Sequence, residues 1–317
     1  MESEANLRLC YYGTRVCFKI KLIYMLLEVE TKLEENPVVI EYVTNIGIIL
    51  LAIFITIISL IWCFKLIESI YIDYIGGKPL FRHFYFRVRD LKSNQKRILE
   101  SQFKFYNTLG IKERRYFRHR VHKFLSITEF VGKEGVIITD QHRVLVAATA
   151  IMLTFGYRDY AIRLVDKILV YPASFYSNLD KTYHKGHFNP GFRAVIFSWE
   201  DFLIGYKIED DNLNLGIHEF IHALHLSYLK AEYKNEVTAY LFLSGLEAVV
   251  DYINSNEVCK NKIRNSDYFR EYAFENDFEF VAVLIESFIE TPSEFKTQFP
   301  EIYNKVKQML NFNFKGY

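Results

Sequence analysis

The sequence predicts an α+β fold, a mostly helical domain with a small sheet, preceded by one transmembrane helix. Three observations support this prediction. A run of nineteen residues without a charge, Ile46–Phe64, lies near the N-terminus. After Asp90, most apolar residues recur at helical spacing, and only a few short stretches are rich in β-branched and aromatic residues. A chain of 317 residues has room for one large domain or two modest ones.

Composition excludes several classes of function. The 39 Lys and Arg nearly balance the 38 Asp and Glu, so the net charge of +1 gives no nucleic-acid footprint. The four cysteines form no C-x-x-C pair. Neither a disulfide framework nor a cysteine metal site is therefore expected.

The apolar run Ile46–Phe64 has the length of a membrane span. At 1.5 Å per residue it measures roughly 28 Å, enough to cross a hydrocarbon core. Trp62 and Lys65 stand at its end as interface anchors do. A buried core helix would show a polar face, and a cleaved signal peptide would be shorter and followed by small residues.

The charges beside the span predict its orientation and the division of the chain. Lys65, Lys78 and Arg82 follow the span, with further cations after them, whereas the N-terminal side has Lys32 among many acids. The positive-inside rule then places residues 65–317 in the cytoplasm, on a single-pass membrane protein. We expect an N-terminal segment (1–44), a transmembrane helix (45–66), a juxtamembrane linker (67–89) and a main domain (90–317).

Periodicity and turn signals predict the elements of the main domain in order. Helical spacing favours segments that end at glycine, proline or a polar loop. Short β-rich stretches favour strands, and Asn189-Pro190-Gly191 is a turn signal before the last of them. The expected helices are Asp90–Thr108, Lys112–Phe130, Asp140–Thr154, Leu213–Leu226, Lys234–Asn254, Asp277–Glu290 and Ser293–Leu310. The expected β segments are Val136–Thr139, Lys167–Tyr171 and Ala194–Trp199, and 256–267 is expected to be a loop or short helix.

One motif indicates a metal site. His218-Glu219-Phe220-Ile221-His222 has the H-E-x-x-H pattern on the helix expected at Leu213–Leu226. Four residues make about one turn, so both imidazoles face the same way and can bind one zinc ion. Glu219 can then accept a proton from a water in the open metal position. Asp210 or Asp211 can cap this helix. The alternative is a buried helix with two hydrogen-bonded histidines.

A third ligand should come from another element. Glu279 stands in the first turn of the helix expected at Asp277–Glu290, where Asn276 or Asp277 can cap. Its neighbours are apolar, and a carboxylate buried there without a partner costs several kcal/mol or more. A metal ion would be that partner.

The strand expected before the motif helix is the candidate for substrate binding. In zinc peptidases an exposed strand edge pairs with an extended substrate backbone. Val195, Phe197 and Trp199 are the residues we assign to that edge. An ordinary internal strand is the alternative.

The chain resembles the zinc peptidases typified by Mlc titration factor A, and more distantly the catalytic domain of anthrax lethal factor. The resemblance covers about residues 90–312. It rests on an ordered series of short matches: Thr154-Phe155-Gly156, Tyr171–Tyr176, Ser198-Trp199, His218–His222, Tyr272-Ala273, Phe278–Val283, Glu286-Ser287-Phe288, Pro292 and Phe299–Tyr303.

This resemblance implies a zincin-like metallopeptidase of the gluzincin type. Its zinc ligands would be His218, His222 and Glu279, with Glu219 as the general base. Tyr272, seven residues before Glu279, would donate a hydrogen bond to the developing oxyanion. A tyrosine packed in a surface loop is the alternative for Tyr272.

The sequence departs from the family at one position near the motif. His225 stands where the titration factor carries an acid, so support of the ligands can differ. His225 is expected either as a fourth nitrogen near the metal or as a hydrogen-bonded or solvent-facing side chain. Glu286 is either an acceptor for a ligand histidine or part of a surface salt bridge. His184 and His187 receive no metal role.

Together these features predict a membrane-anchored zinc metallopeptidase that faces the cytoplasm and acts on a peptide or protein substrate. The alternative is a zinc-containing interaction protein that sequesters a regulatory partner such as a transcription repressor. The resemblance implies this alternative because the titration factor is named for binding a repressor.

Overall fold

The computed structural model describes residues 37–177, 181–207, 214–230, 236–266 and 268–317. Contacts divide the chain into two compact units, Met1–Ile67 and Glu68–Tyr317. In the first unit only residues 37–67 are described, so most of the N-terminal segment expected at 1–44 lies outside the described residues.

A single long helix, α2 (Pro37–Tyr71), contains the expected membrane span. It extends beyond the expected boundary at residue 45, at least to Pro37, the first residue that the structure describes. The most apolar 18-residue window of Pro37–Tyr74 has a mean hydropathy of 2.9, and none of that window is buried in the protein. Among the described residues, this helix alone has the length and composition to cross a membrane.

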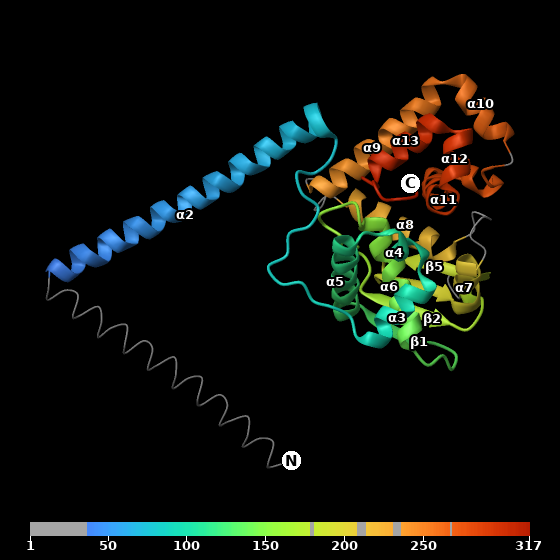
Figure 1. The fold of residues 1–317 in the computed structure, drawn as a ribbon, viewed down its shortest axis with the longest axis horizontal. Helices are drawn as coiled ribbons and strands as arrows, with labels where there is room; N and C mark the ends of the chain where they lie inside the picture. The colour runs from blue at the N-terminus through green and yellow to red at the C-terminus, as the bar shows by residue number, and fades with distance from the viewer. Residues whose placement is uncertain (1–36, 178–180, 208–213, 231–235, 267) are drawn as a thin grey trace, which may run out of the picture. The chain divides into compact units, whose positions relative to one another are not determined.

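A four-stranded sheet lies at one end of the second unit, in the order β1-β2-β6-β5 (Figure 1). The first three strands are parallel, and the edge strand β5 is antiparallel to β6. A separate hairpin pairs β3 with β4. The bounds are β1 Glu129–Gly132, β2 Lys167–Tyr171, β3 Phe175–Ser177, β4 Thr182–His184, β5 Gly186–Asn189 and β6 Ala194–Ser198.

One sequence expectation for the sheet needs correction. Lys167–Tyr171 is a strand with the expected bounds, but Val136–Thr139 is not one. The chain turns at Gly135, whose φ is +84°, and a Cβ on Gly132 would lie 1.8 Å from the Val136 carbonyl oxygen. This tight turn takes 136–139 out of the sheet, and the preceding residues pair with β2 instead.

Helices make up most of the remaining domain. Asp140–Thr154 and Asp277–Glu290 have the expected bounds. The last expected helix is in fact two, because Pro300 has no backbone N–H to continue the first. The helices are α3 Ser93–Gln102, α4 Lys104–Thr108, α5 Ile111–Ile127, α6 Asp140–Thr154, α7 Trp199–Lys207, α8 Leu215–Leu229, α9 Val237–Ser255, α10 Glu257–Asn265, α11 Asp277–Glu290, α12 Pro292–Gln298 and α13 Pro300–Met309. A π-turn (Ile72–Gly76) and a 3₁₀ turn, η2 (Glu271–Phe274), complete the described elements.

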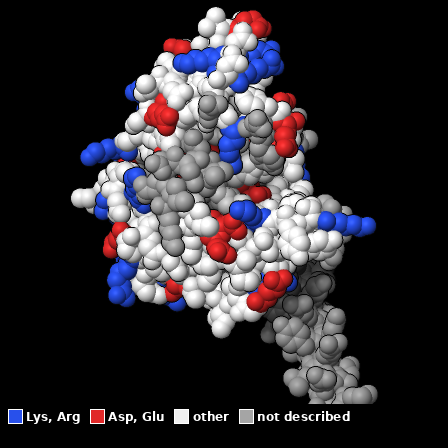
Figure 2. All heavy atoms as spheres, turned by 90° about the vertical axis from the view of Figure 1, so that its right-hand side faces the viewer, with Lys and Arg blue, Asp and Glu red and all other residues white. Residues whose placement is uncertain are grey.

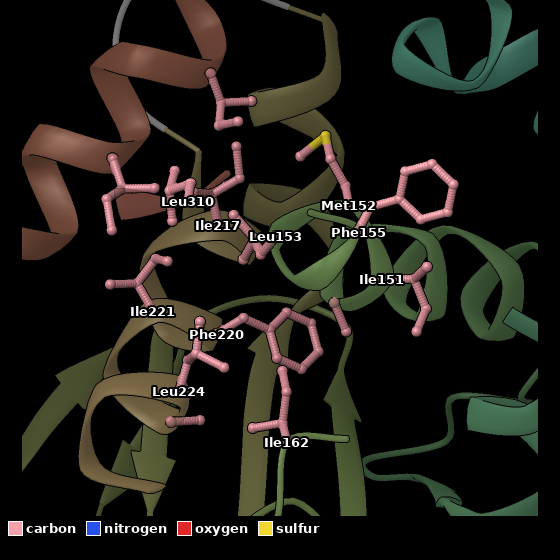
Figure 3. Close-up of a cluster of buried hydrophobic side chains, with 14 of the residues drawn as sticks. Ile151, Met152, Leu153, Phe155, Ile162, Ile217, Phe220, Ile221, Leu224 and Leu310 are labelled. Carbon is pink, nitrogen blue, oxygen red and sulfur yellow. The ribbon is translucent and has the colours of Figure 1, made fainter. Parts of the chain in front are cut away.

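Helix α8 occupies the centre of the domain. It contacts β5 and β6 on the sheet side, α6 beside it, and α9 and α11 among the C-terminal helices (Figure 1). Ile217, Phe220, Ile221 and Leu224 on α8 pack against α6 residues such as Leu153 (Figure 3). Burying such side chains stabilises the fold by about 1.5–3 kcal/mol each. One face of α8 is therefore fixed in the core, and this fixes where its opposite face points.

The expected linker 67–89 is held against the domain. Arg120 is fully buried and donates hydrogen bonds to the hydroxyl of Tyr85 (2.6 Å) and to the carbonyls of Arg82 (2.9 Å) and Tyr157 (2.8 Å). Because Arg120 reaches several carbonyl groups at once, it fixes the juxtamembrane segment as part of the compact unit.

We predict that Gly156→Ala destabilises the domain. A Cβ there would lie 2.1 Å from the Leu310 carbonyl oxygen, so the C-terminal segment after α13 must move. We expect a loss of about 1–3 kcal/mol in the free energy of unfolding. Urea denaturation of the full chain in detergent measures it. Gly191→Ala is the control, because its Cβ would meet only the Asn189 side chain at 3.4 Å. Equal stability of the two variants would contradict the prediction.

Candidate metal centre

Asn214 starts the helix that carries the motif. Its side chain accepts a hydrogen bond from the Ile217 N–H (3.1 Å), and its amide donates to the Gly205 carbonyl and to Glu290 (both 2.9 Å). Helix α8 therefore begins at Leu215, two residues later than expected. The expected caps Asp210 and Asp211 lie outside the described residues.

The two motif histidines meet on one face of α8. The Nε2 atoms of His218 and His222 are 3.0 Å apart, and the rings are perpendicular. His218 is buried, whereas His222 is half-buried and so borders solvent. This face is opposite the apolar side chains that pack on α6.

Glu279 approaches the histidines from α11. Its Oε2 lies 3.1 Å from His218 Nε2, and its Oε1 lies 3.4 Å from His222 Nε2. As expected, Asn276 caps this helix, accepting from the N–H groups of Phe278 (3.0 Å) and Glu279 (3.1 Å). A carboxylate in the first helical turn is also favoured by the helix dipole.

The three side chains fit a zinc ion. One donor atom from each of His218, His222 and Glu279 lies within 4.8 Å of the other two. Two ligands of a tetrahedral zinc, each bonded at about 2.0–2.1 Å, lie roughly 3.3 Å apart. The His218–His222 separation of 3.0 Å and the separation of 3.1 Å between His218 and Glu279 Oε2 are close to that value, and the other Glu279 oxygen lies 3.4 Å from His222. Nitrogen and carboxylate donors of this kind suit zinc.

Glu286 supports His218 from behind. It is 1% exposed, and its Oε2 lies 3.4 Å from His218 Nδ1 and 2.5 Å from Arg270 Nη2. The backbone N–H of Asn214 donates to its other oxygen. When His218 carries its proton on Nδ1 and donates it to Glu286, its Nε2 is the nitrogen that can bind a metal ion. Of the two roles expected for Glu286, burial excludes the surface salt bridge.

The site carries an excess of negative charge. Glu219, Glu279 and Glu286 surround the two histidines, and Arg270 is the cation that contacts one of them. Burial lowers the pKa of His218, but its bonds to Glu279 and Glu286 outweigh this and raise it. Burial and the neighbouring His218 lower the pKa of His222 to about 4. A bound divalent cation would offset the charge of these carboxylates.

Glu219 is held beside the edge strand β5. Burial raises the pKa of its carboxyl to about 7, although a hydrogen bond from the Phe188 backbone acts in the opposite direction. A Cβ on Gly186 would lie 2.7 Å from Glu219 Oε1 and 2.5 Å from Leu215 Cδ1. Only glycine therefore leaves room for the Glu219 carboxylate in this position.

The structure corrects the expected substrate edge. Strand β6 lies between β2 and β5, so its backbone is paired on both sides, and Val195 and Phe197 are fully buried. Trp199 begins α7 and stacks on Phe202. The alternative of an ordinary internal strand is what the structure has. The edge of the sheet beside α8 is β5.

The other residues considered in the sequence analysis are not part of the three-residue cluster. Tyr272 lies in η2, and its side chain is outside what the structure describes. His225 is buried against Phe278 with ring centroids 4.5 Å apart and is not one of the three clustered ligands. His184 and His187 lie on β4 and β5, with ring centroids 5.4 Å apart.

Sequence reasoning missed three contributors, Asn214, Arg270 and Gly186. Asn214 immediately precedes the helix, so the N-cap preference for asparagine was a usable signal. The contacts of Arg270 and Gly186 depend on tertiary structure, and no local pattern reveals them.

Comparison with known proteins agrees with this geometry. Residues 81–311 match the protein family described as glucose-regulated metallo-peptidase M90. The chain is also similar to a protein of Synechocystis sp. described as uncharacterized, with 23% identity over 259 residues, which is 75% of this chain and 91% of that protein.

We predict that the purified chain binds one zinc ion and that three substitutions abolish this binding. His218→Ala, His222→Ala and Glu279→Ala each remove a donor, which should weaken binding at least about 100-fold. Competition with a chromogenic chelator measures the affinity. His225→Phe is the control and should bind zinc as the wild type does. A loss of zinc in His225→Phe would instead indicate a fourth nitrogen ligand.

Proposed function

The chain belongs to the glucose-regulated metallopeptidase family M90, and we propose that it is a zinc-dependent peptidase of the gluzincin type. His218, His222 and Glu279 are the proposed ligands. The observation that carries the proposal is the convergence of these three donors beside the buried carboxylate of Glu219. A zinc ion held there supplies Lewis-acid chemistry, which lowers the pKa of a water molecule and polarises a carbonyl.

Glu219 is the proposed general base. It follows the first ligand on α8, and its carboxylate is buried and fixed against β5. It takes a proton from the attacking water and later passes it to the leaving amine. His222 and Glu279 keep some exposure to solvent, which supports access of a substrate from this side.

Strand β5 is the proposed binding edge for the substrate backbone. The Lys185 carbonyl accepts a hydrogen bond from Ser198 on the β6 side (2.6 Å). Because peptide groups alternate along an antiparallel strand, those of Gly186 and Phe188 point to the other side. The bond from Phe188 to Glu219 agrees with this alternation. An extended peptide added at this edge would pass the metal ligands.

Tyr272 is proposed to donate a hydrogen bond to the oxyanion that forms on the scissile carbonyl. The support is its position in η2, which packs against α11 just before Glu279. A phenol can donate a hydrogen bond to a developing oxyanion and deliver a proton later.

Helix α2 is proposed to anchor the enzyme in a membrane, with the catalytic domain in the cytoplasm. Its apolar length and the cations after it support both parts. A spanning helix keeps the chain in the membrane pellet after alkaline carbonate extraction, whereas release into the supernatant contradicts the anchor.

If the chain were an interaction protein, its zinc site would need different features. A structural zinc site that only holds a partner needs neither an open position nor a carboxylate such as Glu219 beside the ion. Peptide turnover by the wild type therefore decides between the two functions.

We predict that Glu219→Gln keeps zinc but lowers kcat for peptide hydrolysis by about 10²–10⁴-fold. Tyr272→Phe, in the same assay, should lower kcat by about 10–10³-fold. A chromogenic peptide panel measures turnover, and zinc content is measured in parallel. Glu247→Gln, exposed on α9, is the matched control. Undiminished turnover in Glu219→Gln would remove this mechanism, and an inactive wild type that still retains a partner protein would favour the alternative.

We also predict that Gly186→Ala lowers kcat while zinc affinity stays unchanged. The added methyl displaces the Glu219 carboxylate, and a misplaced general base costs about 10–100-fold in rate. Steady-state kinetics with the same peptides measure it. The Gly191→Ala variant again provides the control, since it lies beyond the end of β5. A fully active Gly186→Ala would contradict the assigned position of Glu219.

A further inference from the structure

An aromatic and basic segment follows α2. Residues 74–89, the aromatic–basic segment, contain the four cations Lys78, Arg82, Arg87 and Arg89 and no Asp or Glu. By contrast, acidic and basic side chains are interspersed over the face of the protein drawn in Figure 2. A run of one charge sign without a counter-charge attracts a surface of the opposite sign.

Several aromatic side chains of this segment are exposed, whereas Tyr85 is half-buried against Arg120. Phe84 is 67% exposed, Phe86 98% and Tyr74 83%. Ring centroids are 6.2 Å apart for Phe81 and Phe84, and 5.1 Å apart for Phe84 and Phe86. The rings of Phe81, Phe84 and Phe86 therefore form a continuous apolar patch that the described part of the domain does not cover.

The patch begins at the end of the apolar helix. Glu68 on α2 forms a two-bond ion pair with Arg158, with both distances 2.8 Å, and accepts from the Leu80 N–H (3.3 Å). The Arg158 guanidinium in turn lies 4.6 Å from the centre of the Phe81 ring. Glu68 is four residues beyond Phe64, which is about 6 Å along a helix. The start of the patch therefore follows the apolar run closely along the chain.

We propose that the aromatic–basic segment binds the anionic headgroups of the same bilayer that α2 crosses. The inference rests on the proposed membrane span. Aromatic rings and cations beside the end of a span are the pairing that the headgroup layer favours. The rings enter the interface, and the exposed Lys78, Arg87 and Arg89 contact phosphate groups, whereas Arg82 is half-buried over Phe314.

This second contact fixes the orientation of the catalytic domain. A domain joined to one helix by a free linker can rotate about it. Here Arg120 holds residues 82–85 against the domain, so lipid bound to this segment also holds the domain. The metal centre then keeps one orientation relative to the bilayer.

Tryptophan fluorescence of the full chain in lipid nanodiscs tests the proposal. Phe86→Trp is made in a Trp62→Phe background, where Trp199 gives the same signal in every variant. The discs contain phosphatidylcholine, alone or with phosphatidylglycerol, with bromine on the acyl chains as quencher. We expect the emission of the tryptophan introduced at position 86 to fall by about half in the anionic discs and less in the neutral ones. Ile137→Trp, at a position that is 82% exposed before α6, is the control and should not be quenched.

Charge reversal provides the second arm. Arg87→Glu with Arg89→Glu, both exposed, should reduce quenching of Phe86→Trp to the level of Ile137→Trp. Lys123→Glu with Arg264→Glu makes the same charge change elsewhere and should leave it unaltered.

Quenching of Phe86→Trp no greater than that of Ile137→Trp in anionic discs would overturn the inference. A blue shift without quenching that grows with protein concentration would overturn it in favour of a second copy of the chain. Carbonate extraction separates the two proposals. If the chain stays in the pellet while quenching is absent, only the lipid contact fails; if it is released, the span fails as well.

Discussion

The buried negative charge around two imidazoles is the constraint on which the site depends. Glu219, Glu279 and Glu286 lie beside His218 and His222, and one arginine, Arg270, contacts this group. Uncompensated buried carboxylates cost several kcal/mol each, so a divalent cation offsets a large penalty. Two helices supply the donors, and each has an asparagine cap at its start. Because the Asn214 backbone also donates to Glu286, the caps and the ligands form one connected network.

Features that depend on local periodicity could be predicted from the sequence. Helix geometry alone places the first and fifth residues of the motif on one face, and burial of Glu279 among apolar neighbours indicated its need for a partner. Sheet order depends on long-range pairing that no local pattern encodes, so β6 was expected at an edge and lies inside the sheet. The turn at Gly135 and the break at Pro300 changed two other elements. At Gly135 and Pro300 the backbone geometry, and not the spacing of apolar residues, determines where the element ends.

The last residues of helix α2 belong to the same compact unit as the metal-binding domain. The compact unit starts at Glu68, whose carboxylate is buried against Arg158 although it stands on the apolar helix. The sequence indicates a linker because the region contains Gly76-Gly77 and many charges. The contacts of Arg120 and Arg158 come from distant positions, so composition alone does not reveal that this region is part of the domain.

Zinc K-edge X-ray absorption of the zinc-loaded full chain tests the central claim most directly. The account predicts two imidazole nitrogens and light oxygen ligands at about 2.0–2.2 Å, with no sulfur in the first shell. Sulfur scattering near about 2.3 Å, or a single imidazole, would show that zinc binds elsewhere and would contradict the account.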